Sequence, residues 1–313
     1  MRIEYHRTLI ADHVRNQAIY DALKAQIAPG ETSVADIGAG TGLIGLMAAK
    51  LGAREVFLYE SEPVGAVAEE VLRANRAKGC TVFPFSSLDI DDPPQVDLVV
   101  SETLGNYAFE ENMIETLNDA AARHLKPGGA LLPSCVRQYV APVIAPRLYD
   151  ELSVWDNVGF GLDLSLAKEM SLNNVYVRAF KPDELFQPEG TVWDTVTFRA
   201  GPAKNSTKRK GDAEWTVQND VTVYGLAYWW AAEFGTTSII GTSPGDRQTH
   251  WEQLYFPCAK PMQIMGGEGI RALITSSSSF DAGTHLAWSV ARTNGSGKVL
   301  ERQKMDLDRG YLP

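Results

Sequence analysis

Cysteine is scarce in this chain of 313 residues, and Cys80, Cys135 and Cys258 are widely spaced and odd in number. This spacing offers neither the paired framework of a disulfide-stapled protein nor the clustered ligands of a zinc site. We therefore expect three reduced cysteines, no disulfide bond and no bound metal.

Long apolar runs are also missing, and no stretch approaches the roughly 20 residues that a membrane-spanning helix requires. The first six residues contain no apolar signal region. With 44% hydrophobic and 22% charged residues, the composition is typical of a globular protein. We expect a cytoplasmic protein without a membrane partner.

Basic residues are outnumbered, since 29 Lys and Arg stand against 39 Asp and Glu and the formal net charge is −10. Proteins that bind phosphate backbones use clustered Lys and Arg, so the composition argues against nucleic acid as the main partner. The one basic cluster, residues 204–210, lies in a stretch rich in Gly, Pro and Ser and is predicted to be a solvated loop.

Up to residue 133, apolar runs alternate with segments of helical spacing. We expect strands at 33–37, 55–60, 81–85 and 96–100, and helices at 8–27, 43–51, 64–78 and 111–124. Strands that alternate with helices indicate an α/β fold with a doubly wound parallel sheet.

The pattern changes after Pro133. Short aromatic, β-rich segments separated by Gly and Pro follow, which is typical of a barrel or a sandwich. An insert at about 147–185 is partly helical. We therefore predict two domains, residues 1–133 and 134–313.

Two glutamates nine residues apart are the most informative feature of the chain. Glu102 directly follows the apolar run 96–100, and Glu111 can return across the same site if Gly105 and Asn106 turn the chain. The carboxyl end of a parallel strand is where open α/β sheets bind ligands. Because like charges repel, two carboxylates in one pocket indicate a cationic ligand, and a guanidinium can be held bidentately.

A glycine-rich turn follows the first predicted strand. Gly38, Gly40 and Gly42 are spaced G-x-G-x-G, whereas dinucleotide-binding loops have G-x-G-x-x-G. Glu60 ends the next strand, where a carboxylate can accept both ribose hydroxyls. Asp36 precedes the loop and can face a positive group such as an amino-acid amine. Together these residues indicate S-adenosylmethionine, although a glycine-rich turn without a ligand is the alternative.

These pieces, in this order, resemble the protein arginine N-methyltransferases over nearly the whole chain. The matching motifs are the segment 6–15, the glycine loop at Gly38, the acidic residue Glu60, the double-glutamate hairpin 101–111 and Thr249-His250-Trp251. The last two motifs are specific together, because they lie far apart in the sequence and in different predicted domains.

The resemblance implies a methyltransferase domain over residues 1–133 and a β-barrel substrate domain over residues 134–313. It further implies that the insert at about 147–185 contains a dimerisation arm, so we expect a homodimer.

The resemblance also implies S-adenosylmethionine as cofactor and S-adenosylhomocysteine as product. Arg15 would pair with the cofactor carboxylate, His6 would cover the cofactor and Glu60 would bind its ribose. Ser86 and Ser87 stand where the family has a Val-Glu pair near the adenine. The full set of implied cofactor contacts is His6, Arg15, Asp36, Gly38, Gly40, Thr41, Glu60, Ser61, Ser86 and Ser87.

For catalysis, the resemblance implies that Glu102 and Glu111 clamp the substrate guanidinium. Asp12 and His250 would pair beside the clamp, where a catalytic and a purely structural bridge are about equally plausible. The substrate site would also include Leu9 and Trp251, and Leu9 replaces a methionine that limits the product in the family.

The substrate is open between two readings. Only five residues precede His6, where the family has a longer helix, and Thr103 and Leu104 replace bulkier residues. The short N-terminus and the compact size favour free L-arginine, as in bacterial biosynthesis of streptozotocin-type antibiotics. The alternative is an enzyme that methylates Arg-Gly-rich peptides. A catalytically silent relative that binds S-adenosylmethionine or a partner is a third reading, against which the intact Glu102, Glu111 and His250 argue.

Overall fold

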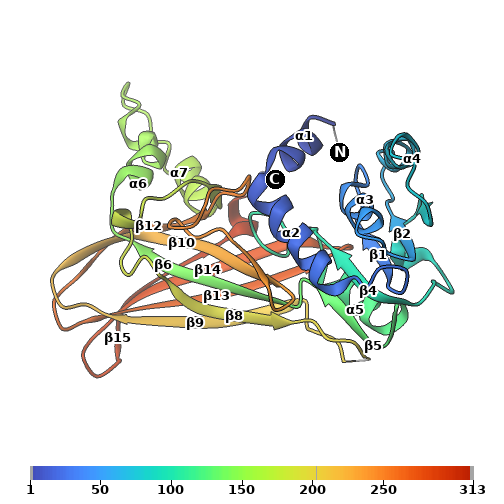
Figure 1. The fold of residues 1–313 in the computed structure, drawn as a ribbon. Coiled ribbons are helices and arrows are strands. Elements are labelled where there is room, and N and C mark those ends of the chain that lie inside the picture. Colours follow the sequence, from blue (N-terminus) through green and yellow to red (C-terminus); the bar gives the residue numbers. More distant parts are fainter. Residues whose placement is uncertain (1–2, 202, 311–313) are drawn as a thin grey trace.

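Two bodies with different sheets make up the molecule (Figure 1). In the computed structural model, which describes residues 3–201 and 203–310, a parallel sheet flanked by helices precedes a larger antiparallel β region. The predicted class, a doubly wound sheet followed by a β-rich part with a helical insert, is confirmed. None of the helices in these described residues is long and apolar enough to cross a membrane.

The parallel sheet has the strand order β3-β2-β1-β4-β5. Its strands are β1 (Ser33–Ile37), β2 (Glu55–Tyr59), β3 (Cys80–Phe83), β4 (Val96–Ser101) and β5 (Leu125–Leu132). The helices of this part are α1 (Ile3–Ala11), α2 (His13–Gln26), α3 (Leu43–Lys50), α4 (Gly65–Ala74) and α5 (Met113–Arg123), with the short η1 (Ser87–Asp89). The strand order reverses between β1 and β4, and ligands of such sheets bind at the carboxyl ends of the strands at this point.

Two elements differ from the sequence-based prediction. The expected single helix over 8–27 is two helices, because Asp12 interrupts it and its carboxylate caps α2 by accepting a hydrogen bond from the Arg15 amide. No strand is predicted directly after the helix at 111–124, yet residues 125–132 form β5. Its Pro127 and Gly128 fit an edge strand, which tolerates residues that a central strand does not.

The antiparallel region consists of two sheets. One has the order β7-β12-β10-β6-β8 with β11 paired to β10, and the other has the order β15-β14-β13-β9. The first sheet contains β6 (Cys135–Val143), β7 (Tyr176–Val177), β8 (Thr191–Thr197), β10 (Val221–Phe234), β11 (Ser238–Gly241) and β12 (Leu254–Ile264). The second contains β9 (Lys208–Thr216), β13 (Gly269–Ser279), β14 (Gly283–Thr293) and β15 (Val299–Asp306), followed by η4 (Leu307–Gly310).

Aromatic side chains fill the space between these two sheets. Tyr228 stacks on Phe256, and Phe256 stacks on Trp288 of the other sheet, with ring centroids 5.7 and 5.2 Å apart. In the described residues the strands form two hydrogen-bonded sheets and not one closed ring. The basic cluster 204–210 was expected to be a loop throughout, but its last three residues begin β9.

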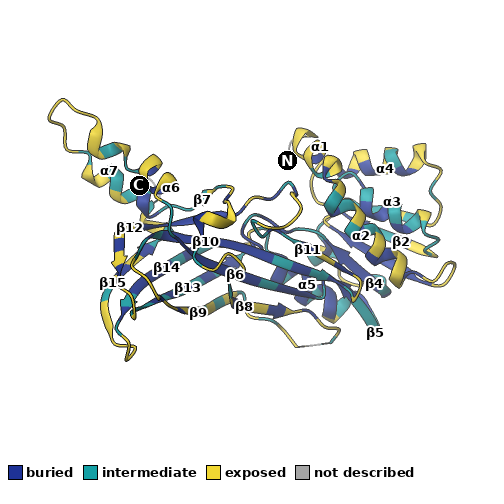
Figure 2. Ribbon diagram, turned by 60° about the vertical axis from the view of Figure 1, so that its left-hand side comes forward, coloured by how far each residue is buried: buried dark blue, intermediate teal, exposed yellow. Residues whose placement is uncertain are grey.

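The helical insert projects from the antiparallel region, away from the parallel sheet (Figure 2). It contains α6 (Arg147–Leu152), η2 (Val154–Asn157) and α7 (Ser165–Leu172), and η3 (Pro182–Glu184) follows it. Its tip exposes large apolar side chains, with Phe160 93% and Leu166 72% exposed. Such side chains usually lie in a core or an interface.

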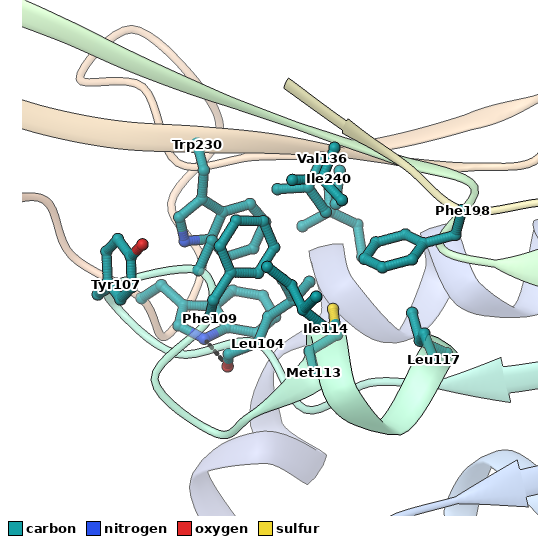
Figure 3. Packing of buried hydrophobic residues seen from close by; sticks show 14 of the residues in the cluster. Leu104, Tyr107, Phe109, Met113, Ile114, Leu117, Val136, Phe198, Trp230 and Ile240 are labelled. Carbon is teal, nitrogen blue, oxygen red and sulfur yellow. Dashed lines mark hydrogen bonds between the residues drawn. The ribbon is translucent and has the colours of Figure 1, made fainter. Parts of the chain in front are cut away.

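One apolar core joins the two bodies (Figure 3). Leu104, Phe109 and Met113, which follow β4, pack in the same cluster as Trp230 and Ile240 of the antiparallel region. The residues between β4 and α5 therefore lie at the seam between the two sheet types, and their position depends on both.

The close approach of β8 and β9 generates a test of the fold. A Cβ atom at Gly211 of β9 would lie 1.8 Å from the Trp193 carbonyl oxygen, so Gly211→Ala must push the strands apart. We expect a loss of about 1–3 kcal/mol in the free energy of unfolding, measured by urea denaturation. Gly245→Ala, whose Cβ would meet no atom within 4 Å, is the control. Equal stability of the two variants would contradict this packing.

Candidate active site

A cavity of about 200 Å³ opens where β1 and β4 end. Helix α1 covers it with Tyr5, His6 and Leu9, and the glycine loop after β1 lies opposite. The other predicted site residues that line it are Arg15, Gly38, Gly40, Thr41, Glu60, Glu102 and Glu111. Most of the residues selected from the sequence therefore meet at one place.

The glycine loop has a left-handed backbone conformation that residues other than glycine rarely adopt. Gly38, Gly40 and Gly42 have φ values of +76°, +54° and +79°. A Cβ at Gly38 would lie 2.7 Å from the Thr103 methyl group, and one at Gly40 would lie 3.1 Å from the His6 ring. The loop thus passes closely between the end of β4 and the covering helix, and a ligand can approach its backbone.

Glu60 lies beside this loop and holds it. Its Oε2 accepts a hydrogen bond of 2.7 Å from the Gly40 amide, and its Oε1 accepts one of 2.8 Å from the Glu62 amide. Each carboxylate oxygen has a second lone pair, so the pair of oxygens remains able to accept bonds from a ligand. The neighbouring Ser61 is exposed.

Asp36 lies beneath the loop, away from the cavity lining. It is fully buried and its Oδ2 accepts a hydrogen bond from the Gly45 amide in α3, while Oδ1 has no partner among the described residues. Burial raises the pKa of this carboxyl to about 7. The sequence placed Asp36 facing a cofactor amine, whereas its visible partner is the first turn of α3.

Ser86 and Ser87 also lie away from the cavity lining. The Ser86 hydroxyl accepts a hydrogen bond from the Leu88 amide and caps η1. Ser87 is buried, and its carbonyl oxygen accepts a hydrogen bond from the Arg123 guanidinium. Within the described structure these serines hold the turn after β3.

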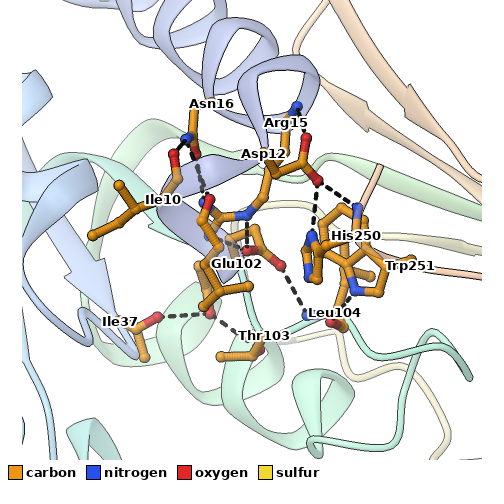
Figure 4. Close-up of polar contacts among 12 residues, drawn as sticks. Ile10, Asp12, Arg15, Asn16, Ile37, Glu102, Thr103, Leu104, His250 and Trp251 are labelled. Atoms are coloured by element: carbon orange, nitrogen blue, oxygen red, sulfur yellow. Dashed lines mark hydrogen bonds and ion pairs between the residues drawn. The ribbon is translucent and has the colours of Figure 1, made fainter. Parts of the chain in front are cut away.

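Glu102 is paired with a guanidinium of the protein itself (Figure 4). Its side chain is 2% exposed. Its Oε2 accepts hydrogen bonds from both Nε and Nη2 of Arg15, and its Oε1 accepts one from the Leu104 amide. The sequence predicted a cofactor carboxylate as the partner of Arg15. Within the chain its partner is Glu102, because an unpaired carboxylate this deeply buried is costly.

Asn16 is a site residue that the sequence reasoning missed. Its side-chain oxygen accepts a hydrogen bond of 2.7 Å from Nη1 of Arg15, and its Nδ2 donates to the carbonyl oxygens of Leu9 and Ile10. Asn16 therefore orients Arg15 and ties the end of α1 over the cavity. The only signal in the sequence was a polar residue beside the predicted Arg15.

Glu111 faces the same cavity as Glu102. Burial, followed by the charges of Glu102, Glu110 and Glu60, raises the pKa of Glu111 to about 7. The repulsion expected from two carboxylates in one pocket therefore appears at Glu111, and a cation placed beside it would relieve that repulsion.

Asp12 and His250 join α2 to the loop after β11, 238 residues away in the sequence. Asp12 Oδ2 accepts bonds of 2.8 Å from both the amide and Nδ1 of His250. Burial alone would raise the pKa of Asp12, but hydrogen bonds from Arg15 and His250 lower it overall. Burial lowers the pKa of His250, and its Nε2 is buried without a partner among the described residues.

His6 lines the cavity, and Trp251 is bonded to the lining residue Leu104 without lining the cavity itself. Trp251 donates a hydrogen bond of 2.8 Å from Nε1 to the Leu104 carbonyl, and Trp230 donates one of 2.9 Å to the Gly105 carbonyl. Burial lowers the pKa of His6, whose Nε2 has no partner in the described structure. The sequence identified Trp251 and His6 but not Trp230, which looked like one more aromatic residue of a strand.

Comparison with known proteins agrees with this geometry. Residues 137–291 match the family model described as arginine methyltransferase oligomerization subdomain, and residues 12–152 match that of ribosomal protein L11 methyltransferase. Protein arginine N-methyltransferase 6 of Xenopus tropicalis is 28% identical over 94% of this chain and 90% of its own length. The chain belongs to the protein arginine methyltransferase family.

Other members of the arginine methyltransferase family agree in sequence or in fold. A probable histone-arginine methyltransferase of Oryza sativa subsp. indica is 27% identical over 85% of this chain, which spans 53% of that relative. The PRMT1 enzyme–prozyme complex of Trypanosoma brucei with AdoHcy has a TM-score of 0.83 at 22% identity, covering 98% of each chain. Arabidopsis thaliana protein arginine methyltransferase 10 has a TM-score of 0.81 at 20% identity and the same coverage.

The protein arginine methyltransferase family was the one expected from the sequence. The predicted class of enzyme, an arginine N-methyltransferase dependent on S-adenosylmethionine, is therefore confirmed at the level of the family.

The raised pKa of Glu111 predicts a stability effect with a definite sign. The folded-state pKa of about 7 lies above the ordinary value of 4.5, so the stability that protonation contributes is present below pH 4.5 and lost as pH rises through 7. Glu111→Gln cannot ionise and should stabilise the fold by about 1–2 kcal/mol at pH 8, after allowance for solvent screening, and by little at pH 5.

Urea denaturation of both proteins at pH 5 and pH 8 measures this effect. Glu69→Gln, an exposed change on α4, is the control and should shift neither value. A Glu111→Gln effect that is the same at both pH values would contradict the raised pKa of Glu111.

Proposed function

We propose that this protein transfers a methyl group from S-adenosylmethionine to a guanidino nitrogen of arginine in a polypeptide. The observation that carries the proposal is the convergence of Glu102 and Glu111 on one cavity at the ends of β1 and β4. A guanidinium is planar, always charged and rich in N–H donors, so it suits two carboxylates that repel each other.

The residues around the glycine loop fit S-adenosylmethionine. The loop lets a ligand approach its backbone, and Glu60 beside it has oxygens that can accept two ribose hydroxyls. Arg15 would hold the cofactor carboxylate with N–H groups not used on Glu102 and Asn16, since a guanidinium has five. When bound, this cofactor supplies a methyl group already activated by the sulfonium.

The main task of the protein residues is then orientation. Glu102 and Glu111 would fix the plane of the substrate guanidinium and draw its positive charge away from the attacking nitrogen. Alignment of this kind can lower a barrier by about 7–11 kcal/mol. The substrate cation would also favour the ionised form of Glu111, whose pKa is otherwise raised to about 7.

The attacking nitrogen must lose a proton during or after transfer. Nε2 of His250 is one candidate acceptor, because burial lowers the pKa of this imidazole and the nitrogen has no partner in the described structure. The clamp carboxylates are the other. The Asp12–His250 pair also joins the two bodies, so its structural role stands beside either choice.

The names of the relatives support a polypeptide substrate. The Xenopus tropicalis relative is called a protein arginine methyltransferase, and the Oryza relative a probable histone-arginine methyltransferase. Free L-arginine is the second candidate, favoured by the small volume of the cavity under α1. Presence of both clamp glutamates favours an enzyme over a catalytically silent relative.

Labelled S-adenosylmethionine with an Arg-Gly peptide or with free L-arginine tests the proposal, with the products identified by mass. We expect methylated peptide. Glu102→Gln should lower kcat at least 100-fold, because the clamp loses a charge. Glu69→Gln is the control. Methylation of free arginine alone would replace the peptide reading, and transfer to neither substrate would overturn the enzyme proposal.

We infer in addition that the helical insert forms a homodimer. The matched oligomerization subdomain spans it, its tip exposes Phe160 and Leu166, and the Trypanosoma brucei relative forms a heterotetrameric complex. An apolar tip of this kind is stabilised when a partner covers it.

The double variant Phe160→Asp/Leu166→Asp should therefore be monomeric in light scattering, whereas the parent chain is dimeric. Leu300→Asp, at an exposed apolar position on β15, is the control and should keep the dimer. A parent chain that is monomeric, or a double variant that stays dimeric, would contradict the role of the arm.

A further inference from the structure

The inward face of β13 changes its chemistry part-way along the strand. Ile270, Ala272 and Ile274 point into the core, and the next two inward positions are Ser276 and Ser278, which are also buried. Side chains of a strand alternate between its faces, so an apolar residue would be the ordinary choice at both positions. A buried hydroxyl needs a hydrogen-bond partner.

Both partners belong to the segment 102–112 that contains the two glutamates. The Tyr107 hydroxyl donates a hydrogen bond of 2.5 Å to Ser276 Oγ. Ser278 Oγ donates to the Phe109 carbonyl oxygen and lies 3.2 Å from Asn112 Oδ1. The hydroxyls of β13 therefore anchor this segment from the antiparallel side of the seam.

The contacts of Ser278 flank Glu111 in the sequence. Phe109 lies two residues before Glu111, and Asn112 follows it with a positive φ of 59°, at the start of α5. A positive φ is uncommon for a residue other than glycine, so the backbone at Asn112 has few alternatives. The position of Asn112 therefore affects the direction in which the Glu111 side chain points. One hydroxyl thus touches both ends of the short stretch that carries Glu111.

Other bonds reach the segment from residue 104 to residue 110, the last being a 3.5 Å bond from the Thr284 hydroxyl to the Glu110 carbonyl oxygen. Trp251 binds the Leu104 carbonyl, Trp230 binds the Gly105 carbonyl, and the Tyr228 hydroxyl accepts from the Ala108 amide. The two indole contacts fix the chain near Glu102, and the Tyr228 contact fixes it three residues before Glu111. Ser278 is the side chain that contacts the segment on both sides of Glu111, through Phe109 and Asn112.

We propose that Ser278, assisted by Ser276, is a positioning residue that sets where the Glu111 carboxylate stands relative to Glu102. The inference rests on the proposed function, in which the two carboxylates must fit one guanidinium. Misplacement of a reacting group by about 1 Å can cost up to about 100-fold in rate. Ser278 itself touches no substrate, so it acts through the backbone around Glu111.

Steady-state kinetics of Ser278→Ala, Ser278→Thr and Ser277→Ala test the proposal with S-adenosylmethionine and an Arg-Gly peptide. We expect Ser278→Ala to lower kcat/KM for the peptide about tenfold and to leave the Kd for S-adenosylmethionine within twofold. Ser278→Thr keeps the hydroxyl, and a strand position suits a β-branched residue. This variant should therefore retain most of the parent kcat/KM. Ser277→Ala, on the opposite face of the same strand, should behave as the parent chain.

Amide hydrogen exchange of the protein segment 102–112 provides a second measurement, which does not depend on catalysis. Ser278→Ala should speed exchange of the amides near Glu111 at least fivefold, and Ser277→Ala should not. Unchanged exchange, or a loss of cofactor affinity as large as the loss in kcat/KM, would overturn the positioning role. A parent chain that methylates nothing would overturn the proposed function, while the exchange rates still decide whether Ser278 holds this segment.

Discussion

The ion pair between Glu102 and Arg15 is the contact on which the architecture of the site depends. A carboxylate this deeply buried is destabilising without a cation, so α2 must bring Arg15 to the end of β4. Asp12, three residues before Arg15, caps the same helix and holds His250 from the antiparallel region. One turn of α2 therefore joins the covering helix, the parallel sheet and the loop after β11 around a single cavity.

A second constraint comes from the seam between the two sheet types. The segment 102–112 is irregular, yet its backbone groups cannot go unpaired in a buried place. Indoles and hydroxyls from β10, β13 and the loop at Trp251 satisfy them. The two carboxylates are consequently held by a scaffold that is mostly outside the domain that carries them, and the raised pKa of Glu111 is a consequence of that enclosure.

Much of the fold could be predicted because its signals are local. Buried parallel strands are continuous apolar runs, and the glycine loop needs a backbone with positive φ, so both are visible in the residue types. The strand β5 and the break at Asp12 were missed, because Pro127 and Gly128 weaken a strand signal and a capping aspartate looks like any polar helix residue. Only pairing with β4 and with His250 reveals them.

The sequence by itself determined the class of fold, the glycine loop and the pair of glutamates at the end of β4, because these depend on residue type and spacing along the chain. Tertiary structure decided which groups meet: Arg15 binds Glu102, Asp36 turns under the loop, and Ser278 reaches the segment of Glu111. The physical reason is that a buried charge or hydroxyl takes whichever partner the packing brings to it, and residues far apart in the chain supply that partner.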